Sequence, residues 1–157
     1  MKTEINFKPK GLFKSGHFQT VYASLFHKPT QLENTQRIPL KTEEQTTIEY
    51  ELNKTKKNTT NLVILVHGLE GSSNSNYIIS TAKKLVEQNF DVIRINLRNC
   101  GNTIHLTKTF YNAGLTHDLK YLLEHVHSDN TYENIFLAGF SLGANLVLKL
   151  GGEYGDN

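Results

Sequence analysis

Cysteine and long apolar runs are scarce in this sequence, and each scarcity excludes a class of protein. The 157 residues include one cysteine, Cys100, and no tryptophan. A single cysteine cannot form a disulfide within the chain, which excludes a small fold held together by disulfides. No apolar run approaches the roughly 20 residues of a membrane-spanning helix, and the first residues lack the apolar segment of a signal peptide. We therefore expect a cytoplasmic protein without a membrane span.

An excess of charge of one sign is also missing. The chain has 17 Lys and Arg residues against 15 Asp and Glu residues, a net charge of +2. Because these cations form no dense patch, we expect no nucleic-acid partner. The 7 histidines show no metal-ligand spacing, so we expect no metal site. Nucleotide binding is disfavoured, since neither G-x-G-x-x-G nor G-x-x-x-x-G-K-[ST] follows any predicted strand.

The beginning of the chain differs in composition from the rest. Residues 1–36 combine lysines with aromatic side chains, and we interpret them as an N-terminal arm whose aromatic rings pack on the domain. A segment that lies on a membrane surface is the alternative, because it has the same composition. Residues 37–157 are predicted to form the domain itself.

The hydrophobic pattern of the domain alternates between strand and helix periods. Loose alternation over 37–52 predicts a pair of strands. Apolar runs at 61–66, 91–97 and 134–139 are typical of strands buried on both faces of a parallel sheet. Helical spacing follows each run, at 78–86, at 115–126 with Thr116 as the expected N-cap, and at 142–150. This order predicts an α/β fold with a mainly parallel sheet covered by helices.

The strongest chemical signal is the G-x-S-x-G motif Gly139-Phe140-Ser141-Leu142-Gly143. It lies between a predicted strand and a predicted helix, which is the setting of the nucleophile elbow in serine hydrolases. Glycines beside the serine let strand and helix approach, and the helix N-terminus supplies free N–H groups. We therefore predict that Ser141 is a nucleophile. The alternative is a chance match in a turn of small residues.

The second signal is His67-Gly68-Leu69, which follows the first buried run. An oxyanion hole in such an enzyme takes one N–H from the residue after the nucleophile and one from a loop after another strand. Leu142 and Leu69 are the predicted donors, and His67 and Gly68 are predicted to orient the loop. A role for His67 as catalytic base is the alternative. Cys100 is interpreted as a small buried filler, with a reactive thiol as its alternative.

Four further blocks give the sequence a family resemblance. They are His17-Phe18-Gln19-Thr20, the stretch 67–77, Arg98-Asn99-Cys100-Gly101 and the stretch 111–119. With the G-x-S-x-G motif, they resemble the YheT-like branch of the α/β-hydrolases, the type-4 AB-hydrolase family, in order and spacing from about residue 11 onward. Two positions depart from the family pattern: Asn99 replaces a glycine, and Asn112 replaces a histidine.

The resemblance implies an incomplete α/β-hydrolase fold, with this chain as its N-terminal portion and the C-terminal strands missing. It implies a serine-dependent carboxylic ester hydrolase that acts on short- or medium-chain acyl esters or lipid esters, without metal or organic cofactor. In this fold the triad acid and histidine follow the serine, and no histidine follows Ser141 here. We therefore expect the chain alone to be nearly inactive and poorly stable. The alternative is a non-catalytic relic or interaction domain that retains the elbow.

Overall fold

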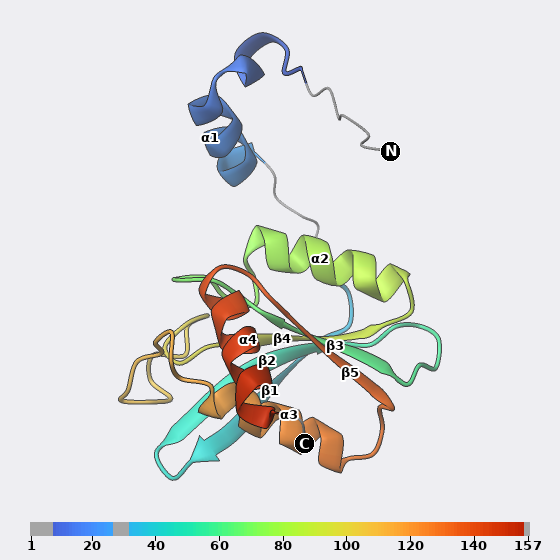
Figure 1. Cartoon of the computed structure of the whole chain (residues 1–157). Coiled ribbons are helices and arrows are strands. Elements are labelled where there is room, and N and C mark those ends of the chain that lie inside the picture. The colour runs from blue at the N-terminus through green and yellow to red at the C-terminus, as the bar shows by residue number, and fades with distance from the viewer. Residues whose placement is uncertain (1–7, 27–31, 156–157) are drawn as a thin grey trace.

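The computed structural model describes residues 8–26 and 32–155 and contains a five-stranded sheet with helices on both faces (Figure 1). The strands are β1 (Thr35–Glu43), β2 (Thr46–Asn53), β3 (Asn61–Val66), β4 (Asp91–Asn96) and β5 (Asn134–Gly139). The helices packed on the sheet are α2 (Asn76–Glu87), α3 (His117–Ser128) and α4 (Leu142–Tyr154). The alternation of strand and helix that the sequence predicts is confirmed.

The sheet is mixed, with the strand order β1-β2-β4-β3-β5. The three strands predicted from apolar runs are parallel, because β3 pairs in parallel with both β4 and β5. The hairpin β1–β2 joins the sheet antiparallel to β4. Only Glu44 and Gln45 separate β1 from β2, and so short a connection can only reverse the chain. The expected mainly parallel sheet is therefore limited to β3, β4 and β5.

β3 lies at the centre of two apolar layers. Leu62, Ile64 and Val66 pack in one buried cluster with side chains of α3 and α4. Val63 and Leu65 point the other way and pack with Ile78 and Ala82 of α2 and with Val92 of β4. Burying each such side chain contributes roughly 1.5–3 kcal/mol, which explains the unbroken apolar run of this strand. Its carboxyl end is thereby held rigidly at the edge where the candidate site lies.

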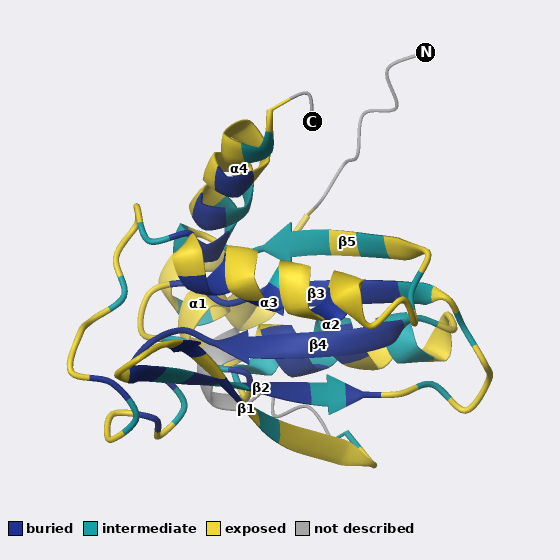
Figure 2. Cartoon of the chain, turned by 90° about the horizontal axis from the view of Figure 1, so that it is seen from below, coloured by how far each residue is buried: buried dark blue, intermediate teal, exposed yellow. Residues whose placement is uncertain are grey.

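β5 differs from the other parallel strands in its exposure. Figure 2 shows β4 buried along its length, whereas β5 is intermediate or exposed. Phe136 in β5 is 50% exposed, because β5 lies at one end of the strand order and pairs only with β3 among the described residues. The apolar run 134–139 therefore forms the predicted strand, but among the described residues its far edge is unpaired and it is not buried on both faces.

The N-terminal arm forms a 3-10 helix, Gly11–Lys14, and the helix α1 (Gly16–Phe26). Phe13 packs against Phe18 and Tyr22, with ring centroids 5.2 and 5.0 Å apart. These aromatic rings of the predicted arm therefore contact one another. Residues 1–7 and 27–31 of the predicted arm lie outside the described residues. No described helix is both long and apolar enough to cross a bilayer.

Thr116 directly precedes α3, as expected for an N-cap, but its side chain does not cap the helix. Its hydroxyl instead donates a hydrogen bond to Glu153 Oε2 of α4 at 2.5 Å. Nearby, the Asn145 side-chain amide donates to the Ala113 carbonyl at 2.8 Å. These two contacts tie α4, which begins at the candidate site, to the segment that precedes α3.

Candidate active site

Ser141 lies at the turn between β5 and α4 and is exposed. Its backbone has φ +51° and ψ −118°, a conformation that residues with a side chain rarely adopt. Such strain costs on the order of 1–3 kcal/mol and persists only where the surroundings impose it. Here the Phe140 N–H donates to the Val66 carbonyl at 3.0 Å, and the Gly143 N–H donates to the Phe140 carbonyl at 2.9 Å. The turn is therefore held from both sides.

The glycines on either side of Ser141 are required by close backbone contacts. A Cβ on Gly139 would lie 2.3 Å from the Gly143 carbonyl oxygen. A Cβ on Gly143 would lie 2.4 Å from the carbonyl oxygens of both Val66 and His67. These contacts bring the N-terminus of α4 directly onto the carboxyl end of β3, where the loop that begins at His67 starts.

We expect Gly143→Ala to lower the free energy of unfolding of the full-length protein by about 1–3 kcal/mol, because backbone must shift to admit the methyl group. Gly152→Ala in the same helix is the matched control. A Cβ there meets nothing within 4 Å, so alanine should stabilise the helix by up to about 1 kcal/mol. Chemical denaturation of both variants tests the pair. Equal stabilities would contradict the close approach at Gly143.

The loop after β3 lies against the Ser141 turn. A methyl group on Gly68 would lie 3.2 Å from the Ser141 Cβ and 3.2 Å from the Phe140 carbonyl oxygen. The N–H groups of Leu69 and Leu142, the two predicted donors, have no hydrogen-bond partner among residues 8–26 and 32–155. The structure therefore brings the predicted residues of the loop and of the turn to one edge of the sheet.

His67 is buried at the start of this loop, with both ring nitrogens in hydrogen bonds. Its Nε2 accepts from the Leu97 N–H at 3.2 Å, so Nε2 carries no proton. Its Nδ1 then carries the proton and donates to the Gly68 carbonyl at 2.7 Å. Burial lowers the pKa of His67, which keeps the ring neutral. Because neither nitrogen is free to take a proton from Ser141, this arrangement supports the orienting role and not the base.

The lowered pKa of His67 predicts a dependence of stability on pH. The unfolded state protonates this histidine near its ordinary value of about 6.5, and the folded state does so only at lower pH. His67 therefore loses its stabilising contribution as the pH falls below about 6.5, at no more than about 1.4 kcal/mol per pH unit. We expect unfolding curves of His67→Gln to be less sensitive to pH between 7.5 and 5 than those of the unmodified protein. Parallel pH profiles would contradict this.

Two tyrosines, to which the sequence alone assigns no role, contact the same loop. The Gly68 N–H donates to the Tyr77 hydroxyl at 3.0 Å, and the Glu70 N–H donates to the Tyr111 hydroxyl at 2.7 Å. Both tyrosines lie within motif blocks of the family resemblance, but no spacing rule connects them to the loop. The contacts became visible only with the tertiary structure.

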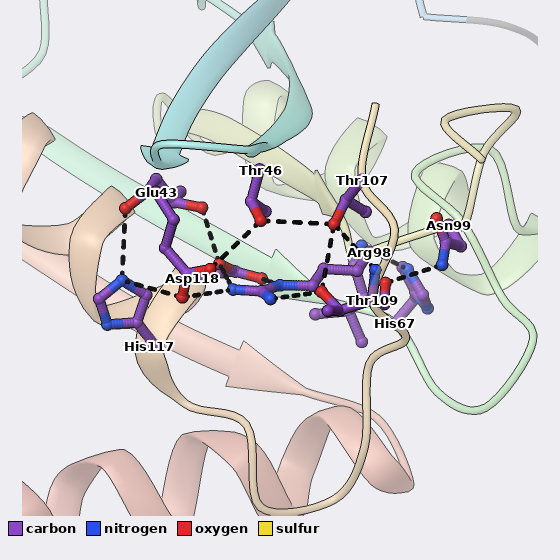
Figure 3. A network of polar contacts seen from close by, with 11 residues as sticks. Glu43, Thr46, His67, Arg98, Asn99, Thr107, Thr109, His117 and Asp118 are labelled. Carbon is purple, nitrogen blue, oxygen red and sulfur yellow. Dashed lines mark hydrogen bonds and ion pairs between the residues drawn. The ribbon is translucent and has the colours of Figure 1, made fainter. Parts of the chain in front are cut away.

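A buried ion pair supports the loop that follows β4 (Figure 3). Arg98 binds Asp118 through two hydrogen bonds, from Nε to Oδ2 at 2.6 Å and from Nη2 to Oδ1 at 2.8 Å. Arg98 also donates to Glu43 at 3.0 Å and to Thr109 at 2.7 Å. The hydrogen bonds to Asp118 raise the pKa of Arg98 above its ordinary value. The network joins the ends of β1 and β4, the start of α3 and the loop that leads to Tyr111.

Cys100 and the two asparagines that depart from the family pattern also lie in this region. Cys100 is buried, and burial raises the pKa of its thiol, which fits the buried filler and not a reactive thiol. Asn99 has φ +64°, a left-handed conformation that glycine and asparagine tolerate best. Asn112 accepts the Gly114 N–H at 2.9 Å. Asn99 therefore adopts a left-handed backbone conformation at the position where the family pattern has glycine.

An open cavity of about 840 Å³ lies beside the loop that follows β3. Its lining comes from that loop and from the loop after β4: Leu69, Glu70, Gly71, Ser72, Asn74, Asn99, Cys100, Gly101, Asn102, Ile104, Phe110 and Tyr111. Leu69, Ile104 and Phe110 are 68%, 69% and 70% exposed. Apolar side chains therefore border the cavity next to the candidate oxyanion loop, whereas Ser141 does not line it.

Comparisons with known proteins agree with this geometry. A family model described as alpha/beta hydrolase fold matches residues 61–157. The monoacylglycerol lipase of Saccharomyces cerevisiae is 28% identical over 60% of the chain and 21% of the lipase. The Escherichia coli protein YheT is 23% identical over 96% of the chain and 45% of YheT. An α/β serine hydrolase without lid from Xanthomonas campestris aligns with a TM-score of 0.65 and 22% identity over 80% of this chain and 59% of that protein. The chain thus spans less than half the length of both curated relatives.

Proposed function

The chain belongs to the α/β-hydrolase fold family, and on this basis we propose that the full-length protein is a serine-dependent carboxylic ester hydrolase. The observation that carries the proposal is the strained, exposed Ser141 at the β5–α4 turn, in contact with the loop that begins at His67. A nucleophile elbow has this geometry, since the sharp turn lifts the serine hydroxyl clear of the sheet. The similarity to a monoacylglycerol lipase supports an ester substrate.

In the proposed reaction, the Ser141 hydroxyl attacks the ester carbonyl carbon and gives its proton to a general base. The N–H groups of Leu69 and Leu142 donate to the oxyanion of the tetrahedral intermediate. Removing one such donor typically costs a factor of about 10²–10³ in rate. The intermediate collapses to an acyl-enzyme as the alcohol leaves with the proton from the base, and water then releases the acid.

The general base in this proposal is not His67, because both of its ring nitrogens are engaged. In this fold the acid and the histidine of the triad follow the serine in sequence. The base would therefore come from a segment that follows α4 in the full-length protein. His67 and Gly68 serve instead to orient the loop that carries the Leu69 N–H.

The cavity beside the loop supports a substrate with an apolar chain. Its border includes the exposed side chains of Leu69, Ile104 and Phe110, and contact with them would remove apolar surface of a substrate from water. We infer a short- or medium-chain acyl ester or a lipid ester, which needs no cofactor for hydrolysis.

The test is an assay of the full-length protein with p-nitrophenyl esters of increasing acyl length, together with labelling by a fluorophosphonate probe. We expect turnover, and mass spectrometry should locate the probe on Ser141. A folded protein that neither turns over esters nor takes the label would favour the alternative of a non-catalytic domain that retains the elbow.

A further inference from the structure

We propose that Tyr77 and Tyr111 are positioning residues whose hydroxyl groups hold the N–H groups on either side of Leu69, so that of these three loop N–H groups only that of Leu69 is left for the reacting carbonyl. This inference rests on the proposed ester hydrolysis. It concerns how the loop after β3 is kept in a conformation that can stabilise an oxyanion.

Three consecutive N–H groups of the loop have different partners. The Gly68 N–H donates to the Tyr77 hydroxyl at 3.0 Å, and the Glu70 N–H donates to the Tyr111 hydroxyl at 2.7 Å. The Leu69 N–H between them has no partner in the described part of the chain. Unpaired N–H groups are rare only where they are buried, and Leu69 is exposed, so its N–H can bind water or a ligand between two engaged neighbours.

The loop needs outside support because its own turn is strained. The Gly71 N–H donates to the Gly68 carbonyl at 3.1 Å, which makes Leu69 and Glu70 the central residues of a β-turn. Glu70 has φ +54°, and the left-handed region costs a residue with a side chain roughly 1–2 kcal/mol. The hydrogen bond from the Glu70 N–H to Tyr111 therefore stabilises the turn at its least favourable residue.

The two hydroxyl groups reach the loop from different segments. Tyr77 lies in the first turn of α2, and its ring packs on Phe140, the neighbour of Ser141, with centroids 4.9 Å apart. Tyr111 lies on the loop after β4 and packs against the buried cluster that includes Cys100. Burial raises the pKa of Tyr111, so its hydroxyl stays neutral while its oxygen accepts from the Glu70 N–H. Each acceptor is thereby fixed by a second contact.

The expected consequence is on the chemical step. An oxyanion donor acts only if it already points at the position where charge develops, and small misplacements lower the rate strongly. Without one tyrosine hydroxyl, an adjacent peptide group can rotate and the direction of the Leu69 N–H is less well defined. Ground-state binding of the ester does not depend on this direction, so kcat should fall while KM changes little.

The test uses the full-length protein with Tyr77→Phe, Tyr111→Phe and the double variant, because phenylalanine keeps each ring and removes only the acceptor. Tyr121→Phe in α3 is the matched control, since the ring of Tyr121 lies beside His117 and not beside the loop. For p-nitrophenyl butyrate we expect each single variant to lower kcat on the order of 10-fold, below the 10²–10³ cost of a lost donor. KM should stay within about twofold. Inhibition by a trifluoromethyl ketone, whose serine adduct carries an oxyanion, should weaken by the same factor as kcat.

Two outcomes would overturn the inference alone, and a third would overturn the proposed function on which it rests. Unchanged kcat and ketone inhibition in both variants would show that the hydroxyl groups do not position the donor, even if melting temperatures fall. A rise in KM with unchanged kcat would make the tyrosines substrate contacts instead. If the unmodified protein shows no turnover beyond that of Ser141→Ala, the proposed function itself fails, and the inference that rests on it falls too.

Discussion

Ser141→Ala in the full-length protein is expected to lower kcat for ester hydrolysis by roughly 10⁶-fold, the scale seen when a triad serine is removed. The reason is that the hydroxyl is the only atom group in the site proposed to form the covalent acyl intermediate. The oxyanion donors Leu69 and Leu142 remain, and they alone sustain only about 10³–10⁴ over the uncatalysed rate. Hydrolysis of p-nitrophenyl butyrate and labelling by a fluorophosphonate probe measure the loss.

Two further variants extend this test: one is a control, and the other probes the backbone strain at Ser141. Ser128→Ala at the end of α3 is the matched control, because the Ser128 hydroxyl only donates to the His125 carbonyl, and its activity should be unchanged. Ser141→Gly should be as inactive as Ser141→Ala but more stable by about 1 kcal/mol, since glycine relieves the strain at φ +51°. Full probe labelling of Ser141→Ala would refute the assignment of the nucleophile.

Asp118→Ala is expected to lower the free energy of unfolding by about 3–5 kcal/mol, because it leaves the buried Arg98 guanidinium without its main partner. The two side chains are only 4% and 3% exposed, so water cannot replace the lost carboxylate. Thr109, which also binds Arg98, lies close to Tyr111 in sequence. Activity should therefore fall as well, since the loop that carries Tyr111 loses its support. Denaturant unfolding measures the stability.

The same helix offers a matched control for the ion pair. Lys120 and Glu124 form an exposed pair at 3.9 Å, with side chains 50% and 55% exposed. Lys120→Ala should change stability by no more than about 1 kcal/mol, as is usual for exposed pairs. The double variant Arg98→Met with Asp118→Leu should recover much of the loss, because it removes both buried charges together. If Asp118→Ala costs no more than Lys120→Ala, the buried pair contributes nothing to the fold.

Strand and helix positions could be predicted from the sequence wherever both faces of an element are covered. β3 shows this best, because helices on both faces demand an apolar residue at every position from Leu62 to Val66. The apolar run of β5 also predicted its strand correctly, but it does not reveal that Phe136 is half exposed. The burial of a strand depends on which elements pack beside it, and the apolar pattern of its own residues does not show those elements.

For the candidate site, too, local features could be predicted from the sequence, whereas contacts between distant segments could not. Ser141 and the loop from His67 to Leu69 could be predicted, because glycine–serine turns and strand-to-helix junctions leave a signature within a few neighbouring residues. The contacts of Tyr77, Tyr111 and Arg98 could not be predicted from the sequence. In the sequence, Arg98 is only a cation after one strand, and Asp118 is only an anion in the first turn of a later helix. Nothing in their positions shows that they form a pair.

The sequence by itself determined the order of strands and helices, the sharp turn at Ser141 and the loop that begins at His67. These depend on backbone preferences and apolar periodicity, which act over a few residues. Only the tertiary structure decided that both nitrogens of His67 are engaged and that Asp118 neutralises Arg98. It also decided that, within residues 8–26 and 32–155, the Leu69 N–H has no partner while both of its neighbours are bound by tyrosines. The physical reason is that the bonds of His67 to Leu97, of Glu70 to Tyr111 and of Arg98 to Asp118 join segments far apart in the chain. These segments meet only after the parallel strands pair and bring their carboxyl ends to one edge of the sheet.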